Sequence, residues 1–331
     1  MHGGTGAPQW TRRSFLALVA LVAARRAVAA EGSAPSPIKL IVPAAPGGSL
    51  DRLGRIVADA LSRILETPVD VQNMPGDGGV TGMNAVAATA PGDGTVLGLA
   101  NSTAIIGGKL LSRSARFKPI EDFDWLTILG TYPNAMVVAQ RSPARDITEW
   151  LELARKAPTP LVYASAGTGS AGHLAGAYLR VEKGARLTHT VVDNLDDGYK
   201  LLGEGFIDVL FDGAPNAMTE VRPRDHRILA VTSEKRVQGL PGVPSFGELW
   251  QRSFDIFVGI VAPKALAQNA YARLAPAVGV LLSEPAHANS LRAAGLNFLG
   301  LSGRGTRAYI ENEFLRNAQL IAALNNEGVR K

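Results

Sequence analysis

The sequence of 331 residues has no cysteine, few aromatic residues (6%) and a modest share of charged residues (19%). Without cysteine the chain forms no disulfide, no thiolate metal site and no lipid attachment at a mature N-terminus. With few aromatic residues and no clustered lysine or arginine face, it has no nucleic-acid footprint. These absences predict a soluble protein that is held together by its core alone.

An apolar run long enough to span a membrane is also missing, because a spanning helix requires about 20 such residues. The run at 15–24 is far shorter and follows the arginine pair Arg12 and Arg13. We interpret residues 1–30 as a twin-arginine export signal, removed near Ala29 and Ala30, and we expect the mature protein in the periplasm. A membrane anchor is the alternative interpretation, which the length of the run disfavours.

Removing the signal changes the charge balance. Residues 1–30 hold four arginines and no acid, so the mature chain has 34 − 4 = 30 basic residues against 29 acidic ones, a net charge of +1. The formal charge of +5 for the whole chain therefore overstates its basicity. About 300 residues are enough for two domains of ordinary size.

The stretch 38–66 predicts a short apolar strand at 38–42, a glycine turn at 46–48 and a helix opened by Ser49. Apolar residues recur at helical spacing from 53 to 65 and form one stripe opposite the charged residues. Ser49 is the predicted N-cap, and Asp51 in the first turn opposes the positive end of the helix dipole. The glycines leave backbone N–H groups uncovered at the helix start, which is a favourable place to bind an anion.

The same order of strand, small polar residues and helix recurs along the first part of the chain. A strand at 68–71 leads into the glycine-rich loop 73–79, and a strand at 95–100 ends at 101–103. Alternating strands and helices predict a parallel sheet with a ligand site outside the carboxyl ends of the strands. We therefore expect these three loops to converge at one edge.

From Trp125 onward the pattern changes, and the segment 132–134 predicts a crossing into a second domain. Further elements are predicted at 147–156 (helix), 161–164 (strand), 171–183 (helix), 190–192 (strand), 197–202 (helix), 207–211 (strand), 228–232 (strand), 254–261 (strand), 270–283, 285–294 and 306–325 (helices). We predict a first domain of residues 31–134 and 256–331 and a second of 135–255. Two crossings between two α/β lobes make a hinge, and a ligand binds in the cleft.

Several motifs in this order resemble one family. They are residues 43–51 (PAAPGGSLD), 73–79 (NMPGDGG), 165–174 (SAGTGSAGHL) and 207–212 (IDVLFD), with 122–123, 229–236 and 240–244 beside them. Together they resemble the extracytoplasmic receptors of tripartite tricarboxylate transporters, the Bug receptors. The resemblance covers nearly all of the mature chain.

The resemblance implies a two-lobed binding protein of the Venus-flytrap type, each lobe a mixed sheet flanked by helices. It implies a monomeric receptor, not an enzyme and without a cofactor, that carries a small organic acid to a membrane permease. In that family the first loop holds a carboxylate mainly through backbone groups and ordered water, with Asp51 orienting the loop. The predicted ligand-binding residues are Pro46, Gly47, Gly48, Ser49, Asp51, Asn101, Ser102, Thr103, Ser165, Ala166, Gly169, Ser170, His173, Asn194 and Asp212.

One loop departs from the family pattern. Where relatives usually carry Pro-Tyr-Lys-Gly, this chain has residues 191–194, Val-Val-Asp-Asn, and then Asp196 and Asp197. Acids in place of a lysine disfavour a second ligand carboxylate on that side. Two interpretations stay open: the ligand is a monocarboxylate with a neutral or cationic far end, or these acids form a solvated turn.

Two enzyme classes are alternatives to a receptor. Residues 168–172 are one residue away from the nucleophile elbow of serine hydrolases, which would make Ser170 the nucleophile. His173 follows on the same helix and is better interpreted as a hydrogen-bonding residue at the helix start. Residues 76–82 resemble a dinucleotide loop of a cofactor-binding oxidoreductase, but with the wrong glycine spacing. The histidines and acids show no metal-ligand spacing.

Overall fold

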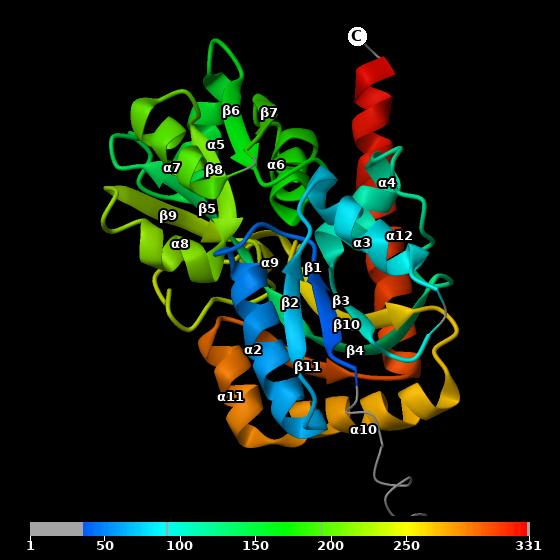
Figure 1. The fold of residues 1–331 in the computed structure, drawn as a ribbon. Helices are drawn as coiled ribbons and strands as arrows, with labels where there is room; N and C mark the ends of the chain where they lie inside the picture. The colour runs from blue at the N-terminus through cyan, green and yellow to red at the C-terminus, as the bar shows by residue number, and fades with distance from the viewer. Residues whose placement is uncertain (1–35, 91, 193, 330–331) are drawn as a thin grey trace, which may run out of the picture. The chain divides into compact units, whose positions relative to one another are not determined.

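The computed structural model describes residues 36–90, 92–192 and 194–329. The predicted export signal and Asp193 lie outside these residues. From Pro37 to Lys331 the chain forms one compact unit, and Figure 1 shows its helices arranged around two separate sheets. Within the described ranges, no helix combines the length and the apolarity needed to cross a bilayer.

The first sheet has six strands in the order β11-β4-β10-β3-β1-β2. Its strands are β1 (Ile38–Val42), β2 (Val69–Asn73), β3 (Val96–Asn101), β4 (Phe123–Tyr132), β10 (Ile256–Pro263) and β11 (Asn297–Leu301). Strands β1, β2 and β3 are parallel, whereas β10 pairs antiparallel with β3 and β4. The sheet is therefore mixed, and its parallel half is the predicted strand-and-helix repeat.

Helices pack around the first sheet, and the longer ones bury an apolar face. They are α2 (Ser49–Leu65), η1 (Asp77–Gly79), α3 (Val80–Ala88), the π-helix η2 (Thr103–Gly108), α4 (Lys109–Leu111), α10 (Gln268–Ser283), α11 (Pro285–Ala293) and α12 (Arg304–Val329). The predicted stripe of α2 is confirmed, since Leu53, Val57 and Leu61 are buried in the core. Burial of this stripe fixes the direction in which the start of α2 points.

The second sheet has five strands in the order β7-β6-β8-β5-β9. Its strands are β5 (Asn134–Ala139), β6 (Leu161–Ser165), β7 (Leu187–Val191), β8 (Val209–Gly213) and β9 (His226–Val231). The helices between them are α5 (Ile147–Lys156), α6 (Ala171–Val181), α7 (Leu195–Glu204), α8 (Ala214–Glu220) and α9 (Phe246–Trp250). The protein is thus two-lobed, with a mixed sheet flanked by helices in each lobe, as predicted.

The chain passes from the first sheet to the second at Pro133, between β4 and β5. It returns to the first sheet at β10, directly after Asp255. Both passages fall within the predicted crossing segments. The exact limits of the two predicted domains, 31–134 with 256–331 and 135–255, stay a prediction.

Some predicted local structures were wrong. The strand predicted at 207–211 continues as β8 to Gly213, and α8, which begins at Ala214, was not predicted. The short elements α9 and β11 were not predicted, because neither has enough residues to show a clear period. Strand β7 begins at Leu187, earlier than predicted, because pairing with β6 extends it.

Candidate ligand-binding site

The start of α2 carries the turn that the sequence singled out. Gly48, in an extended conformation, is the N-cap of α2 and makes no side-chain capping bond. Ser49 is the first helical residue, so its predicted role as N-cap was wrong by one position. Because glycine has no side chain to accept the first N–H groups, this helix start is suited to an anion.

Asp51 orients this turn through three hydrogen bonds. Its carboxylate accepts from the Gly47 N–H (2.9 Å), from Arg55 Nε (3.0 Å) and from Asn73 Nδ2 (2.9 Å). Burial alone would raise the pKa of Asp51, but these bonds outweigh it and hold the pKa below its usual range. Asp51 is therefore an ionised anchor beneath the turn, and it uses the N–H of Gly47 itself.

The residues after β3 form a helix start where the sequence predicted a loop. β3 continues to Asn101, and η2 begins at Thr103. The side chain of Asn101 accepts a hydrogen bond from the Ala104 N–H (2.9 Å), which holds the first turn of η2. Ser102 is 7% exposed, and its Oγ has no hydrogen-bond partner in the described part of the chain.

The loop after β6 is held by its own hydroxyl groups. Ser170 is the N-cap of α6, accepting from the His173 N–H (3.1 Å), and its Oγ donates to Ser165 Oγ (3.0 Å). Ser165 Oγ lies 2.8 Å from His189 Nε2. Both serines are buried. Their hydroxyl groups are therefore committed to the loop, while Ala166 is exposed at its outer side.

A buried pair of histidines supports this loop. The rings of His173 and His189 lie 4.2 Å apart between centroids, and Tyr163 packs against both. Nδ1 of His173 accepts from the Gly169 N–H (3.0 Å), so His173 is the helix-start hydrogen-bonding residue that was predicted. Burial lowers the pKa of His173 to about 4 and that of His189 to about 3.

His189 was missed by sequence reasoning, because it lies 24 positions after Ser165 and no spacing connects them. The pair also bears on the hydrolase alternative. The ring of His173 bonds to Gly169 and not to Ser170, whose hydroxyl caps a helix inside the protein. This geometry gives Ser170 a structural role.

The glycine-rich segment 76–82 is packed against the first lobe's own backbone. A Cβ on Gly79 would lie 2.9 Å from the Pro43 carbonyl oxygen, and a Cβ on Gly82 would lie 2.9 Å from that of Met74. Both glycines are needed for these close approaches. The dinucleotide-like pattern is thus explained by packing.

Asn194, a predicted residue of the second lobe, lies at a helix start. Asn194 is exposed and caps α7, accepting from the Asp196 N–H (3.0 Å). Asp196 pairs with Arg224 (2.9 Å), and Asp197 pairs with Lys200 (3.0 Å). These bonds support the interpretation of Asp196 and Asp197 as a solvated first turn.

Asp212 lies at the end of β8 and is 1% exposed. Its Oδ2 accepts from Tyr199 Oη (2.9 Å) and from Asn216 Nδ2 (2.8 Å), while Oδ1 is buried with no partner among the residues that the structure describes. Burial raises the pKa of Asp212 to about 6, although those two bonds act in the opposite direction. The carboxyl group is therefore poised to change charge near neutral pH.

The two lobes meet at several places, and two of these junctions include predicted ligand-binding residues. At the first, Arg52 of α2 donates to Asn216 Oδ1 of α8 (3.3 Å), and a Cβ on Gly213 would lie 3.3 Å from Ser49 Oγ. At the second, residues 167–169 lie against Gly78 and Gly107 of the first lobe. Ser49 thus lies at the first junction, where Asp212 is hydrogen-bonded to Asn216, and Ser102 and Gly169 lie at the second.

Asn194 lies at the cap of α7 and is in neither junction. Arg52 was missed as a junction residue, because on the sequence it is only one of the charged residues opposite the apolar stripe of α2. Its contact with Asn216 spans 164 positions. No local signal could have revealed it.

Comparisons with known proteins agree with the two-lobed fold. The family described as "Tripartite tricarboxylate transporter family receptor" matches residues 53–326. The chain is 30% identical over 295 residues to a Pseudomonas sp. protein named for the tcbD-tcbE intergenic region, with 87% of each chain covered.

Solved structures are also similar. The periplasmic binding protein BugD is 25% identical, with a TM-score of 0.78 over 87% of this chain and 97% of that one. An R. palustris protein solved with adipate is 23% identical, with a TM-score of 0.81 over 87% of this chain and 97% of that one. The latter likeness concerns the fold alone.

Proposed function

Because the chain belongs to the family of tripartite tricarboxylate transporter receptors, we propose that it binds a small organic carboxylate between its lobes and delivers it to a tripartite tricarboxylate-type permease. The observation that carries the proposal is the start of α2. There a glycine N-cap leaves the first N–H groups without a side-chain cap, and Asp51 holds the turn in place.

The proposed ligand lies with one carboxylate at residues 46–49. The ligand-binding residues predicted from the sequence remain the proposed lining of the site. A carboxylate gains about 1.5–3 kcal/mol for each charge-assisted hydrogen bond, and a helix start adds about 0.3–1 kcal/mol. Four such bonds, less the loss of freedom on binding, reach the roughly 8 kcal/mol of micromolar affinity.

Adipate is the ligand named for an R. palustris protein of this fold. It is a flexible dicarboxylate, and its binding supports a carboxylate as the ligand class for this chain. In the second lobe of this protein, the acids of the first turn of α7 are paired with Arg224 and Lys200. They are therefore less available to repel a ligand than their number suggests.

Export is part of the same proposal. Residues 1–30 serve as a twin-arginine signal, and the mature receptor is a periplasmic monomer. Mass spectrometry of the protein secreted to the periplasm, with and without replacement of Arg12 and Arg13 by lysine, tests this. A mature N-terminus near Ala30 that disappears in the double variant is the expected result; unchanged export would contradict the twin-arginine route.

A thermal-shift screen of carboxylic acids tests the ligand class. Di- and tricarboxylic acids, aromatic acids and acidic amino acids are each added to the purified protein. A true ligand raises the apparent stability by about RT ln(1 + [L]/Kd). No shift with any of these acids at millimolar concentration would contradict the proposal.

Gly48→Val tests the position of the site. A Cβ on Gly48 meets nothing closer than 3.9 Å, and the φ of Gly48 is −73°, so valine fits the fold. We expect the unliganded Tm to be retained and the ligand shift to be lost, because the side chain blocks approach to the backbone. Normal binding by this variant would place the site elsewhere.

Gly242→Val is the matched control. Gly242 is exposed, and a Cβ there meets nothing within 4 Å. We expect this variant to keep both its Tm and its ligand shift. Gly47 is unsuitable for the test, because its φ of +88° would strain any side chain and confound binding with folding.

A further inference from the structure

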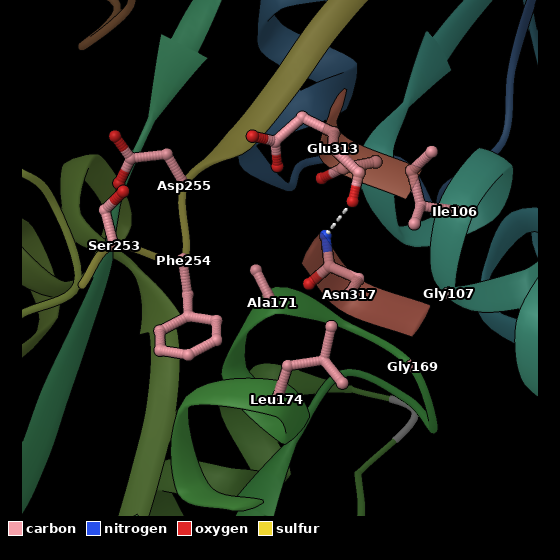
Figure 2. A pocket seen from close by; sticks show the side chains of 11 residues that line it. Ile106, Gly107, Gly169, Ala171, Leu174, Ser253, Phe254, Asp255, Glu313 and Asn317 are labelled. Atoms are coloured by element: carbon pink, nitrogen blue, oxygen red, sulfur yellow. Dashed lines mark hydrogen bonds between the residues drawn. The ribbon is translucent and has the colours of Figure 1, made fainter. Parts of the chain in front are cut away.

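A small cavity of about 20 Å³ lies where four segments of the chain meet. Figure 2 shows Ile106 and Gly107 on one side, Gly169, Ala171 and Leu174 below, Phe254 and Asp255 opposite in the segment before β10, and Glu313 with Asn317 on α12. The cavity is therefore lined by η2 and α12 of the first lobe, by the start of α6 in the second, and by the segment that leads back into β10.

Two polar atoms of the residues that line this cavity have no hydrogen-bond partner among the described residues. One is Oγ of Ser102, whose residue is 7% exposed, and the other is Oδ1 of Asp255. A buried polar atom without a hydrogen bond lowers the stability of the folded protein by about 1–3 kcal/mol. Two such atoms in residues around one cavity therefore require an explanation. A buried water needs roughly 10–15 Å³ and two or more polar partners, which this cavity supplies.

The charged groups around Asp255 come from two elements. Glu313, Arg316 and the titratable Tyr309 lie on α12, and Glu234 lies in the segment after β9. Arg252, three residues before Asp255, acts on Glu313 as a second positive charge. Arg316 pairs with Glu313 (2.7 Å), and Asn317 Nδ2 donates to the Glu313 carbonyl oxygen (2.8 Å). The lining residues from η2 and α6 carry no titratable group.

These surroundings disfavour charge on the two carboxyl groups. Burial, assisted by Glu313, raises the pKa of Asp255 to about 7. Burial also raises the pKa of Glu313, against the opposing effect of Arg316. Arg316 is already paired with Glu313. Among the described ion pairs, none gives Asp255 a counter-charge at bonding distance.

We propose that this cavity is a hydrated proton site that fastens the two lobes together. One water molecule bridges Ser102 Oγ and Asp255 Oδ1, and the Asp255 carboxyl group carries a proton while the lobes are in contact. The site consists only of contacts within the unliganded chain. It does not depend on which ligand the receptor binds.

The stability that the Asp255 carboxyl group contributes decreases as the pH rises. A buried carboxyl group with a raised pKa binds its proton more tightly in the folded state than in the unfolded one. Its stabilising contribution is complete below the ordinary pKa of 3.8 and is lost as the pH rises through about 7. Deprotonation leaves a buried anion beside Glu313, which favours separation of the lobes.

Asp255→Asn tests the proton directly, because the amide keeps the shape and has no charge. We expect the Tm of this variant to match the wild type near pH 5 and to exceed it near pH 8.5 by a few degrees. Asp59→Asn is the control, since the Asp59 side chain is 65% exposed. A Tm difference between Asp255→Asn and wild type that does not grow with pH would overturn the proposal.

Ser102→Ala tests the bridging water. If Ser102 Oγ is simply unsatisfied, its removal raises the Tm; if it holds the water, its removal lowers the Tm. We expect a lower Tm. In the double variant with Asp255→Asn the two effects are expected to be non-additive, because both residues bind the same water. A raised Tm or strict additivity would overturn the bridge.

Hydrogen exchange of the backbone amides tests whether the site holds the two lobes together. After correction for intrinsic rates, we expect residues 169–174 to lose protection in the wild type between pH 6 and pH 8.5 but not in Asp255→Asn. Equal protection in both would contradict the fastening role. A rise in wild-type Tm with Ca²⁺ that is absent in Asp255→Asn would assign the cavity to a cation instead.

If Asp255→Asn does not fold, Glu313→Gln keeps the proposal testable. Removing the Glu313 charge lowers the pKa of Asp255, because Glu313 is one cause of its rise. We then expect the loss of Tm between pH 5 and pH 8.5 to be smaller than in the wild type. An unchanged loss would contradict the proposal.

Discussion

Gly107 and Gly169 bring the main chains of the two lobes into direct contact. A Cβ on Gly107 would overlap the Gly169 carbonyl oxygen, and a Cβ on Gly169 would lie 2.7 Å from Gly107 Cα. Gly169 also has a φ of +83°, which favours glycine. The approach of η2 to the loop before α6 therefore depends on both residues lacking a side chain.

Gly107→Ala is expected to force these segments apart. The methyl group has no space, and overpacking of this kind costs typically 1–3 kcal/mol. Small-angle X-ray scattering is expected to show a larger radius of gyration than the wild type, together with a lower Tm. The control is Gly279→Ala on α10, where a Cβ meets nothing within 4 Å and alanine favours the helix. Identical scattering from Gly107→Ala and wild type would contradict the expected separation of these segments.

Asp51→Asn is expected to loosen the turn before α2. The variant loses the ion pair with Arg55 and weakens the bond from the Gly47 N–H, so we expect a loss of about 1–3 kcal/mol in the free energy of unfolding. Urea unfolding at pH 7 measures it. Asp59→Asn on the same helix is the control, because its exposed pair with Arg63 contributes less than about 1 kcal/mol.

The difference in the free energy of unfolding between wild type and Asp51→Asn is expected to depend on pH. The folded-state pKa of Asp51 is lowered, so its contribution is complete above the ordinary value of 3.8 and is lost as the pH falls through the lower folded value. Urea unfolding at pH 7 and at pH 3 compares the two. An equal difference at both values would contradict the assignment of Asp51 as an ionised anchor.

His189→Gln is expected to flatten the acid side of the stability profile. Burial and the neighbouring His173 lower the pKa of His189 to about 3, so the unfolded chain takes up a proton near pH 6.5 and the folded chain does not. The wild type therefore loses stability as the pH falls from about 6.5, by at most about 1.4 kcal/mol per pH unit for this group.

Urea unfolding of both proteins at pH 7, 5.5 and 4.5 measures this. Asp212 and Asp255 act in the opposite direction over part of this range, because their pKa values are raised. Both proteins share these groups, so the difference between the two profiles isolates His189. A constant difference across the three values would show that His189 is not a buried neutral group.

Asn216→Ala is expected to weaken the first junction. It removes a donor to Asp212 Oδ2 and the acceptor for Arg52, at a cost of about 1–2 kcal/mol. The loss of stability is expected to be larger at pH 8 than at pH 5, because the pKa of Asp212 rises further when it loses this donor. Unfolding measured at both values checks the sign, and a larger loss at pH 5 would contradict it.

The sequence by itself determined the elements that depend on neighbouring residues. The strand at 38–42 and the helix at 147–156 have the predicted bounds, because apolar spacing and turn residues act over a few positions. The ordered motifs also indicated the family and the two-lobed fold. Short-range rules missed Ser49 by one position, since either Gly48 or Ser49 can begin the helix.

Only the tertiary structure decided which side chains meet. Arg52 reaches Asn216, Ser165 meets His189, and Asp255 shares a cavity with Ser102, across separations that no local pattern encodes. These contacts arise when separately folded elements dock, and docking is fixed by the burial of whole faces. Docking also explains why predicted ligand hydroxyls such as Ser165 and Ser170 are bonded to each other.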